Sequence, residues 1–490
     1  MNIILITPPS GFLLDERVFP SLGILKVGAS LLNAGHNVDH WDFSGVSTYE
    51  QEVPVICNIL KNKGELPTFA MTATTPQMPA AIKITKVIRE VLPEAKVILG
   101  GPHATLVNAA TKGERLRAKL GRGCSSLTRL LGHYNVVVTG DGENAIHQAI
   151  SGPTGWFSRK DNLIDADDPK SEHWLTSQGF TDSPWPDRTL IDPNSYHYEI
   201  EGERAMHVVA QLGCPFACGF CGGRESYMLR RIRLRTTENV IAEMEHLHQT
   251  YGVKAMMLND DELNVNPQMI PLMQAIKALG DKYRFTWKLR GFVKAELFND
   301  DQAAALKLAG FEWLLCGFES ANPRILHNIN KKATREDNAK MLHIARKHGL
   351  KVKALMSAGH PGESEDTILD TRDWLLEQRP DDFDLTVITK YPGTPYWDHA
   401  LPIGGNTYCY TFNEDRLYSE DVDFLQDAAY YKGKPGDYKS FVWTDYLSAE
   451  KLCRLRDEIE HEVRLKLGIA YPTSAIAKQY ESSMGQRSNK

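Results

Sequence analysis

The stretch Gly213-Cys214-Pro215-Phe216-Ala217-Cys218-Gly219-Phe220-Cys221-Gly222-Gly223 holds three of the eight cysteines of the chain within eight residues. The apolar run Met206-His207-Val208-Val209-Ala210 precedes it, so we expect the cysteines on a loop that leaves a strand. Thiolates spaced Cys-x3-Cys-x2-Cys suit a soft metal centre, and an iron–sulfur cluster is the usual occupant. Three ligands on a 4Fe-4S cluster leave one iron open for chemistry.

A disulfide and a structural zinc site are the alternatives for these cysteines. A disulfide would pair two of them and leave the third alone, and a structural zinc ion would need a fourth Cys or His nearby. The spacing is not that of a zinc ribbon, so the cluster is favoured. The three-cysteine loop, with aromatic Phe220 before its last cysteine, resembles that of the radical S-adenosylmethionine (SAM) superfamily.

Length and composition narrow the class of protein. A chain of 490 residues predicts two or three domains, and its net charge of −6 gives no electrostatic reason to expect nucleic acid as a partner. The longest apolar runs have strand length, so no membrane-spanning helix is expected. The other cysteines are scattered, which suits free thiols in the reducing cytoplasm. They are Cys57, Cys124, Cys316, Cys409 and Cys453.

Residues 1–150 alternate short apolar runs with amphipathic segments. This alternation predicts a doubly wound parallel sheet of the Rossmann-like or flavodoxin-like kind. The apolar runs are 3–6, 38–41, 69–72, 97–99 and 136–138. Each is followed by a loop rich in Pro, Thr or Gly, where small residues would let a large flat ligand approach the backbone.

These loops could simply punctuate a Rossmann-like scaffold, and no Gly-x-Gly-x-x-Gly nicotinamide fingerprint follows the first strand. The whole pattern nevertheless resembles the cobalamin-binding domain found ahead of many radical SAM domains. The positions that carry the resemblance, and that it implies for cobalamin binding, are Pro8, Pro9, Leu22, Gly23, Thr74, Thr75, Gln77, Gly100, Gly101, Pro102, His103, Gly140 and Glu143. The Asp-x-His-x-x-Gly motif of histidine-ligated domains is absent, so the resemblance implies cobalamin held without a protein histidine. By the same resemblance, His103 is a turn residue near the corrin edge.

Two further segments belong to this half of the chain. Lys112 to Arg129 is basic, and a solvated insertion is favoured over a contact for an anionic substrate or a reductant. Residues 151–204 are rich in Pro, Gly, Ser and Asp and are predicted to be a linker lying against both domains. Its Trp185 and Arg188 could shape the edge of a cavity, although inter-domain packing is favoured.

Residues 205–400 repeat strand and helix six times, which predicts a partial (β/α)6 TIM barrel. Its expected strands are 206–210, 255–258, 285–289, 313–318, 352–356 and 384–388. Polar or Gly-rich residues follow strand after strand, on the edge where barrel active sites form. The resemblance implies a SAM site there. Its expected residues are Phe220, Asp261, Glu262, Arg290, Glu319, Ser320, Ser357 and Gly359. Tyr391-Pro392-Gly393-Thr394-Pro395 resembles the closing loop of the family.

Residues 401–490 are expected to be a small, mainly helical region that could cover the barrel and shape a substrate pocket. Ser448 caps a predicted helix that continues to Leu467, with apolar residues at helical spacing. Residues 482–490 are expected to be disordered.

The resemblance implies a cobalamin-dependent radical SAM enzyme, most simply a methyltransferase. In such an enzyme an electron donor such as flavodoxin or ferredoxin reduces the cluster, and SAM is cleaved to a 5′-deoxyadenosyl radical. That radical removes a hydrogen atom from a small-molecule or natural-product-like substrate, whose unactivated carbon then takes a methyl group from methylcobalamin. A cyclase or rearrangement enzyme of the same architecture, and a non-catalytic protein that binds cluster and corrinoid, stay open as alternatives. Methylthiotransferases normally carry three more N-terminal cysteines and are discounted. The sequence does not name the substrate.

Overall fold

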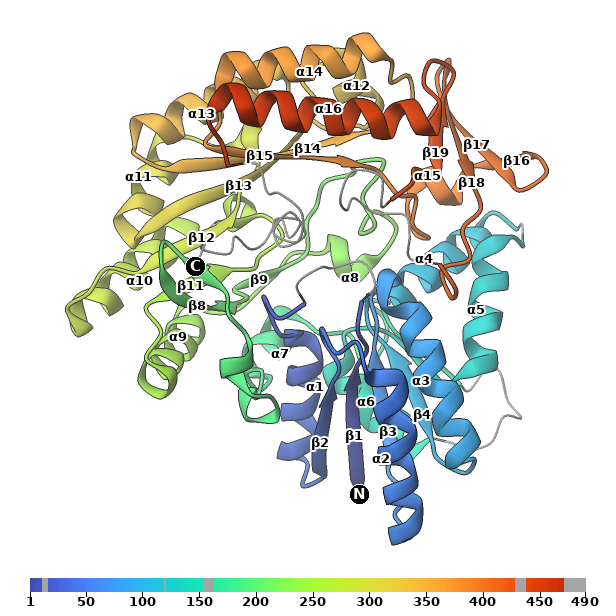
Figure 1. The fold of residues 1–490 in the computed structure, drawn as a ribbon. Coiled ribbons are helices and arrows are strands. Elements are labelled where there is room, and N and C mark those ends of the chain that lie inside the picture. Colours follow the sequence, from blue (N-terminus) through green and yellow to red (C-terminus); the bar gives the residue numbers. More distant parts are fainter. Residues whose placement is uncertain (11–15, 119, 153–161, 428–437, 471–490) are drawn as a thin grey trace.

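A computed structural model describes the chain except for residues 11–15, 119, 153–161, 428–437 and 471–490. The N-terminal sheet with its helices forms the lower half of the molecule in Figure 1, and a curved sheet with its own helices forms the upper half. The expectation for residues 482–490 lies outside the described residues. Within them, no helix is both long and apolar enough to cross a membrane.

The N-terminal sheet has six parallel strands in the order β2-β1-β3-β4-β5-β6. Their bounds are β1 Asn2–Thr7, β2 Asn37–Asp42, β3 Thr68–Thr72, β4 Val97–Gly100, β5 Val136–Gly140 and β6 Leu163–Ala166. Continuous apolar runs form its central strands because helices cover both faces. The predicted doubly wound sheet is confirmed, and a sixth strand lies within the range that was expected to be linker.

Six helices cover this sheet in two layers. They are α1 Leu22–Asn33, α2 Tyr49–Lys63, α3 Met78–Val91, α4 Pro102–Leu116, α5 Arg122–His133 and α6 Gly142–Ser151. Helices α1 and α6 pack on the face that presents Ile3 and Leu5. Helices α2 to α5 pack on the face that presents Ile4 and Ile6. Alternate residues of one buried strand thus supply two separate cores.

The second sheet is the predicted partial barrel. Its order is β15-β14-β13-β12-β11-β8-β7, and all neighbours except β7 and β8 are parallel. The strands are β7 Glu199–Ile200, β8 Glu203–Val208, β11 Ala255–Leu258, β12 Lys288–Phe292, β13 Phe311–Glu319, β14 Lys351–Ala358 and β15 Asp382–Val387. The helices are α9 Thr237–Tyr251, α10 Met269–Tyr283, α11 Asp300–Ala309, α12 Pro323–Asn328, α13 Arg335–Lys347 and α14 Glu365–Gln378.

One strand of the barrel is shifted from its expected position. The apolar run 285–289 was expected to end at Arg290, whereas β12 begins at Lys288 and continues through Arg290 to Phe292. Phe285 and Trp287 are apolar for another reason, because both rings pack around His248 of α9. Arg290 therefore lies in the middle of a strand.

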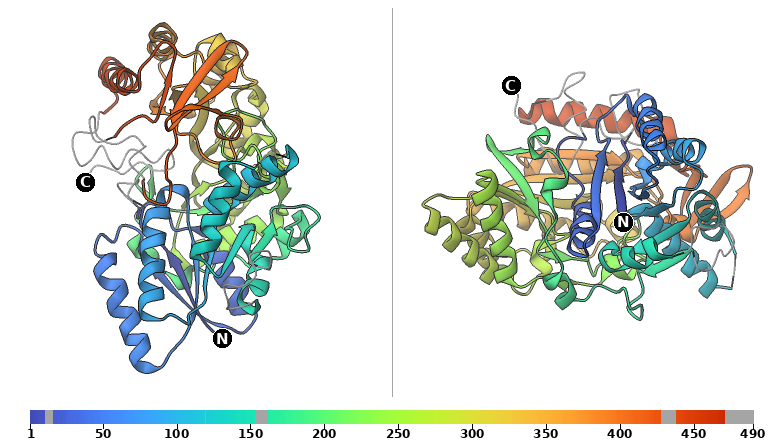
Figure 2. Two further views of the ribbon diagram at one scale, coloured as in Figure 1. Left: turned by 90° about the vertical axis from the view of Figure 1, so that its right-hand side faces the viewer. Right: turned by 90° about the horizontal axis from the view of Figure 1, so that it is seen from below.

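The C-terminal region contains the predicted helix and a sheet that the sequence did not indicate. Helix α16 Ala449–Leu467 is capped by Ser448, whose Oγ accepts a hydrogen bond from the backbone N of Lys451 at 3.2 Å. The helix lies along α14 at the top of Figure 1 and packs on β15. The antiparallel sheet has the order β16-β17-β18-β19, with bounds Leu401–Gly404, Thr407–Phe412, Asp415–Glu420 and Val442–Thr444. Figure 2 shows this sheet from a second direction.

Short elements join these parts. They are α7 Ser177–Asp182 in the linker, β9 Gln211–Leu212, α8 Tyr227–Arg230 and β10 Arg233–Leu234 around the cysteine loop, and α15 Pro395–Asp398 after the barrel. The antiparallel pair β9 and β10 frames the base of the cysteine loop.

Candidate functional site

The cysteine loop leaves β9 at Gly213, which adopts φ +89°. A Cβ at this position would stand 2.1 Å from the carbonyl oxygen of Arg231, so only glycine fits the close approach of the two chains. The backbone N of Gly213 donates to Asp261 Oδ2 at 2.8 Å. The carboxylate at the end of β11 thus holds the base of the loop.

The loop's outward carbonyl groups are held by cationic and amide side chains. Arg224 donates to the carbonyl of Ala217, and Arg230 donates to that of Pro215 at 2.8 Å. Asn330 Nδ2 donates to the same Ala217 carbonyl at 2.7 Å. These bonds fix the loop's backbone with its thiols free for ligation.

The three thiols fit a cluster better than a single ion. Cys214 and Cys218 are partly exposed, Cys221 is exposed, and all three are free. Among the described residues, no three Cys, His, Asp or Glu side chains converge closely enough to hold one metal ion. A cubane cluster instead takes each thiolate on a different iron, so it does not need such convergence.

The three acidic residues after β11, Asp260, Asp261 and Glu262, have different surroundings. Asp260 is buried, and its Oδ1 accepts from the backbone N of Ala210 and of Gln211 at 2.7 and 3.0 Å. Burial raises the pKa of Asp260 to about 7. Asp261 is exposed to solvent, and Glu262 is half-buried. Asp260 therefore supports the backbone ahead of the loop, while the next two carboxylates stay available at the strand end.

A hydrogen-bonded chain crosses the ends of the next two strands. Glu319 Oε2 accepts from Ser357 Oγ at 2.8 Å, and the same Oγ lies 2.8 Å from His360 Nε2. Tyr396 OH lies 3.4 Å from His360 Nδ1. Burial lowers the pKa of His360 to about 3, so the ring is neutral. Phe220 of the cysteine loop meets this ring edge-on, with centroids 5.3 Å apart.

Three of the predicted SAM residues have other surroundings. Ser320 is buried, with its Oγ 3.2 Å from Thr371 Oγ1 of α14. Arg290 lies inside the barrel with its guanidinium carbon 5.8 Å from the centre of the Trp313 ring. Gly359 has φ +95°, and a Cβ there would stand 2.9 Å from Leu452 of α16. The structure thus gives Gly359 a packing role against the C-terminal helix.

A cavity of about 320 Å³ opens at the strand ends of the N-terminal sheet. It continues between the sheet and helices α1 and α6, where its wall is apolar. Seven of the predicted cobalamin positions line it: Leu22, Gly23, Gly100, Gly101, Pro102, Gly140 and Glu143. Val209, Leu212 and Met228, which flank the cysteine loop, line its far side. The cavity therefore joins the two halves of the molecule.

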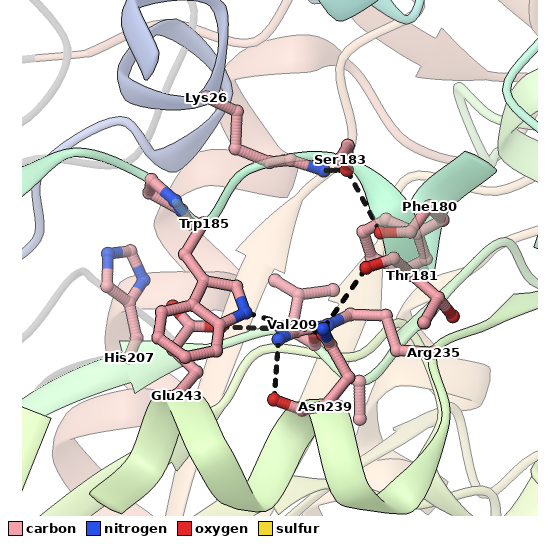
Figure 3. A network of polar contacts seen from close by, with 12 residues as sticks. Lys26, Phe180, Thr181, Ser183, Trp185, His207, Val209, Arg235, Asn239 and Glu243 are labelled. Atoms are coloured by element: carbon pink, nitrogen blue, oxygen red, sulfur yellow. Dashed lines mark hydrogen bonds and ion pairs between the residues drawn. The ribbon is translucent and has the colours of Figure 1, made fainter. Parts of the chain in front are cut away.

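Linker residues line one side of this cavity, and Figure 3 shows the polar contacts around them. Trp185 and Ser183 line it, and Lys26 of α1 donates to Ser183 Oγ at 3.0 Å. Trp185 Nε1 donates to Asn239 Oδ1 of α9 at 3.4 Å. The same oxygen accepts from Arg235 Nε at 2.7 Å. Trp185 thus does shape a cavity edge, while Arg188 is buried and pairs with Glu243.

The remaining predicted cobalamin positions form a bonded turn away from this cavity. Gln77 Nε2 donates to the carbonyl of Pro8 at 2.8 Å, and its Oε1 accepts from the backbone N of Thr74 at 2.9 Å. His103 Nδ1 lies 3.0 Å from Thr75 Oγ1. Pro9 is buried beside Pro8. Burial lowers the pKa of His103 to about 3. This arrangement agrees with His103 as a turn residue.

The basic segment Lys112 to Arg129 is not the solvated insertion that was favoured. Lys112 forms ion pairs with Asp165 at 3.2 Å and with Asp167 at 3.1 Å. Arg122 and Arg129 pair with Asp421 and Asp423 at 2.7 and 2.9 Å. Lys112, Arg122 and Arg129 instead connect α4 and α5 to β6 and to the C-terminal region, because opposite charges face them there, whereas Arg115 and Arg117 are exposed as expected. Lys119 lies outside the described residues.

Helix α4 also touches the cysteine loop directly. A Cβ at Gly222 would stand 3.5 Å from Leu106 Cδ1, and one at Gly393 would stand 3.0 Å from the Leu106 carbonyl oxygen. Asp141, which precedes α6, forms an ion pair with Arg233 just after the loop. The two halves are thus in contact at the end of the cysteine loop and just after it.

Comparison with known proteins agrees with this geometry. Residues 208–375 match the Radical SAM superfamily model. An uncharacterized methyltransferase of Pyrococcus horikoshii is 27% identical over 82% of this chain and 83% of its own length. The anaerobic magnesium-protoporphyrin IX monomethyl ester cyclase of Cereibacter sphaeroides is 25% identical over 66% of this chain and 52% of its own length.

Among solved structures, the radical SAM methyltransferase TsrM from Kitasatospora setae, with cobalamin and a 4Fe-4S cluster bound, superposes with a TM-score of 0.61. It is 15% identical and covers 84% of this chain and 81% of its own, which shows a shared fold. The matched segment runs from the end of β8 through the cysteine loop to α14. The three-cysteine loop and the barrel strands β11 to β14 thus lie in a segment that matches the Radical SAM superfamily.

Proposed function

We propose that the protein is a cobalamin-dependent radical SAM methyltransferase that transfers a SAM-derived methyl group to an unactivated carbon. The proposal rests on the cavity that is lined by both halves of the molecule. The strand ends of the N-terminal sheet form one wall, and Leu212, next to the cysteine loop, belongs to the other. A cofactor bound at the strand ends would face the cluster across the domain boundary.

Cys214, Cys218 and Cys221 would hold a 4Fe-4S cluster, and Gly23, Gly100, Gly101 and Gly140 leave space for the edge of a corrin ring at the strand ends. The apolar extension of the cavity between Val27, Val138 and Ile146 would take a flat part of cobalamin. When bound, the cluster and SAM supply an organic radical, and cobalamin supplies methyl-transfer chemistry.

Residues of the chain itself would bind and orient SAM. Asp261 and Glu262 offer carboxylates to the SAM ammonium, since both lie at the strand end beside the cysteine loop. Glu319 is held by Ser357 and so offers a fixed acceptor to the ribose or the ammonium. Leu106, packed between Gly222 and Gly393, excludes water from the boundary between the two sites.

The relatives favour methyl transfer over the alternatives. The Pyrococcus relative, which matches across most of both chains, is named a methyltransferase, and TsrM is one. The Cereibacter cyclase keeps oxidative cyclisation as the second candidate. The reaction would also require a one-electron donor such as flavodoxin or ferredoxin.

The decisive experiment uses anaerobic protein supplied with cobalamin, iron and sulfide. Cobalt content and the visible spectrum test cofactor binding, and 5′-deoxyadenosine release under reduction tests radical formation. Candidate substrates are then incubated with SAM deuterated on its methyl group. Deuterated methyl in the product supports the proposal. A product without deuterium supports the cyclase, and no 5′-deoxyadenosine with any substrate favours a non-catalytic binding protein.

A further inference from the structure

The segment Ile329-Asn330-Lys331 clasps the cysteine loop from the barrel side. The carbonyl of Ile329 accepts from the backbone N of Gly219 at 2.8 Å, and Asn330 donates to the carbonyl of Ala217. Asn330 adopts φ +54°, a conformation that non-glycine residues rarely take. Ile329 and Asn330 thus contact the two sequence neighbours of Cys218, and buried Lys331 follows them directly.

Lys331 is a buried cation that faces the carboxylate of Glu319. It is 6% exposed, and its Nζ lies 3.4 Å from Glu319 Oε1. A Cβ on Gly317 would stand 2.6 Å from that carboxylate oxygen and 3.2 Å from Nζ. Gly317 therefore leaves the space that this pair occupies.

The charges around Lys331 keep it protonated. Burial lowers its pKa, but the carboxylates of Glu319 and Glu262 act against burial, and the pKa ends above its usual value. A second buried ammonium, that of Lys294, lies nearby, and it is paired with Glu296 at 2.8 Å. Lys331 thus faces Glu319 as a buried ammonium group.

We propose that Lys331 is a positioning residue that places a fixed positive charge beside Cys218 and so raises the reduction potential of the cluster. Reduction adds one negative charge to the cluster. A cation in a water-poor surrounding stabilises that charge more strongly than it would in solvent, and nearby charge is among the factors that set cluster potentials. This inference rests on the proposed function only in requiring the cluster.

The test is an EPR-monitored redox titration of anaerobically reconstituted protein without SAM, cobalamin or substrate. Lys331→Met is expected to shift the midpoint potential to a lower value, and Lys331→Arg to keep it close to that of the wild type. Lys332→Met is the matched control, because Lys332 is adjacent but exposed, and it should leave the potential unchanged. An unchanged potential in Lys331→Met, at full iron content, would overturn the inference.

A second variant decides the matter if Lys331→Met does not retain the cluster. Glu319→Gln removes the negative charge that faces Lys331 and is expected to shift the potential to a higher value. An unchanged or lower potential in that variant overturns the inference. A wild-type protein that holds no cluster would instead refute the proposed function, so the two failures are distinguishable.

Discussion

Arg188 of the linker and Glu243 of α9 form a buried ion pair, with Nη1 and Oε1 3.0 Å apart and both side chains less than 5% exposed. Glu243 Oε2 also accepts from Arg235 at 2.6 Å. One carboxylate therefore pairs with two guanidinium groups at the cavity wall. It connects the linker, the strand that follows the cysteine loop and the first long helix of the barrel.

Replacing Glu243 with Gln should destabilise the protein. Two buried guanidinium groups would lose their counter-charge, and breaking a buried pair in this way costs about 3–5 kcal/mol. Urea unfolding followed by tryptophan fluorescence measures the effect. Glu238→Gln on the exposed face of the same helix is the control and should cost less than about 1 kcal/mol. Equal unfolding midpoints for Glu243→Gln and the wild type would show that the pair does not hold the linker.

Replacing any one of Cys214, Cys218 and Cys221 with Ala should abolish cluster binding. Each would ligate one iron of the cluster through its thiolate. Iron and sulfide analysis after anaerobic reconstitution is the measurement. Cys409→Ala is the control, since Cys409 lies on β17 of the C-terminal sheet, and it should retain full iron. A Cys221→Ala protein with wild-type iron would contradict the ligand assignment.

Gly100→Val should reduce cobalamin binding without loss of the cluster. A Cβ at Gly100 meets its first neighbour only at 3.8 Å, so the added methyl groups enter the cavity without displacing the backbone. Overpacking costs about 1–3 kcal/mol, which weakens binding by about tenfold or more. Titration of cobalamin followed by visible absorption measures it. Gly132→Ala, on α5 with open space around its Cβ position, should bind as the wild type does.

The stability of the protein should depend on pH through Glu363. Its Oε2 accepts from the backbone N of Gly359 and of His360 at 3.0 and 3.1 Å, and burial raises its pKa from 4.5 to about 7. Because the folded pKa is the higher one, the stabilising effect is complete below about pH 4 and is lost as the pH rises to about 7. The slope reaches at most about 1.4 kcal/mol per pH unit.

Glu363→Gln isolates this effect, because the amide oxygen can accept the same two N–H groups and does not ionise. The difference in urea midpoint between variant and wild type should grow in favour of the variant from pH 4.5 to pH 7 and then stay constant. Parallel pH profiles for the two proteins would show that Glu363 does not titrate in this range.

The fold could be predicted from sequence where burial on both faces leaves a continuous apolar run. Strands β1 and β11 are examples, since each ends at a distinct Pro-rich or acidic turn. The antiparallel C-terminal sheet could not be predicted in this way. Its strand β16 is exposed at every residue, and β17 has no buried residue, so no alternating pattern marks them.

The site was predictable where its residues belong to one motif and not where they meet through folding. The three cysteines are adjacent in sequence, so their spacing alone indicated a cluster. Lys331 and Tyr396 belong to no motif and approach the cysteine loop through the turn after α12 and through α15. His360 follows the predicted Gly359 in sequence, but only the structure shows its contact with Ser357. Those assignments to SAM and cobalamin that depend on strand ends stay predictions.

Arg122 has a consequence for engineering this protein. Its guanidinium carbon lies 4.1 Å from the ring centre of Trp397 and 3.7 Å from that of Tyr408, while it pairs with Asp421. The N-terminal domain is thereby fastened to the far end of the chain as well as to its neighbour in sequence. A chimaera that exchanges only the first domain with a relative would place a foreign surface against Trp397, Tyr408 and Asp421. Successful domain exchange would have to transplant α5 together with α15 and β17.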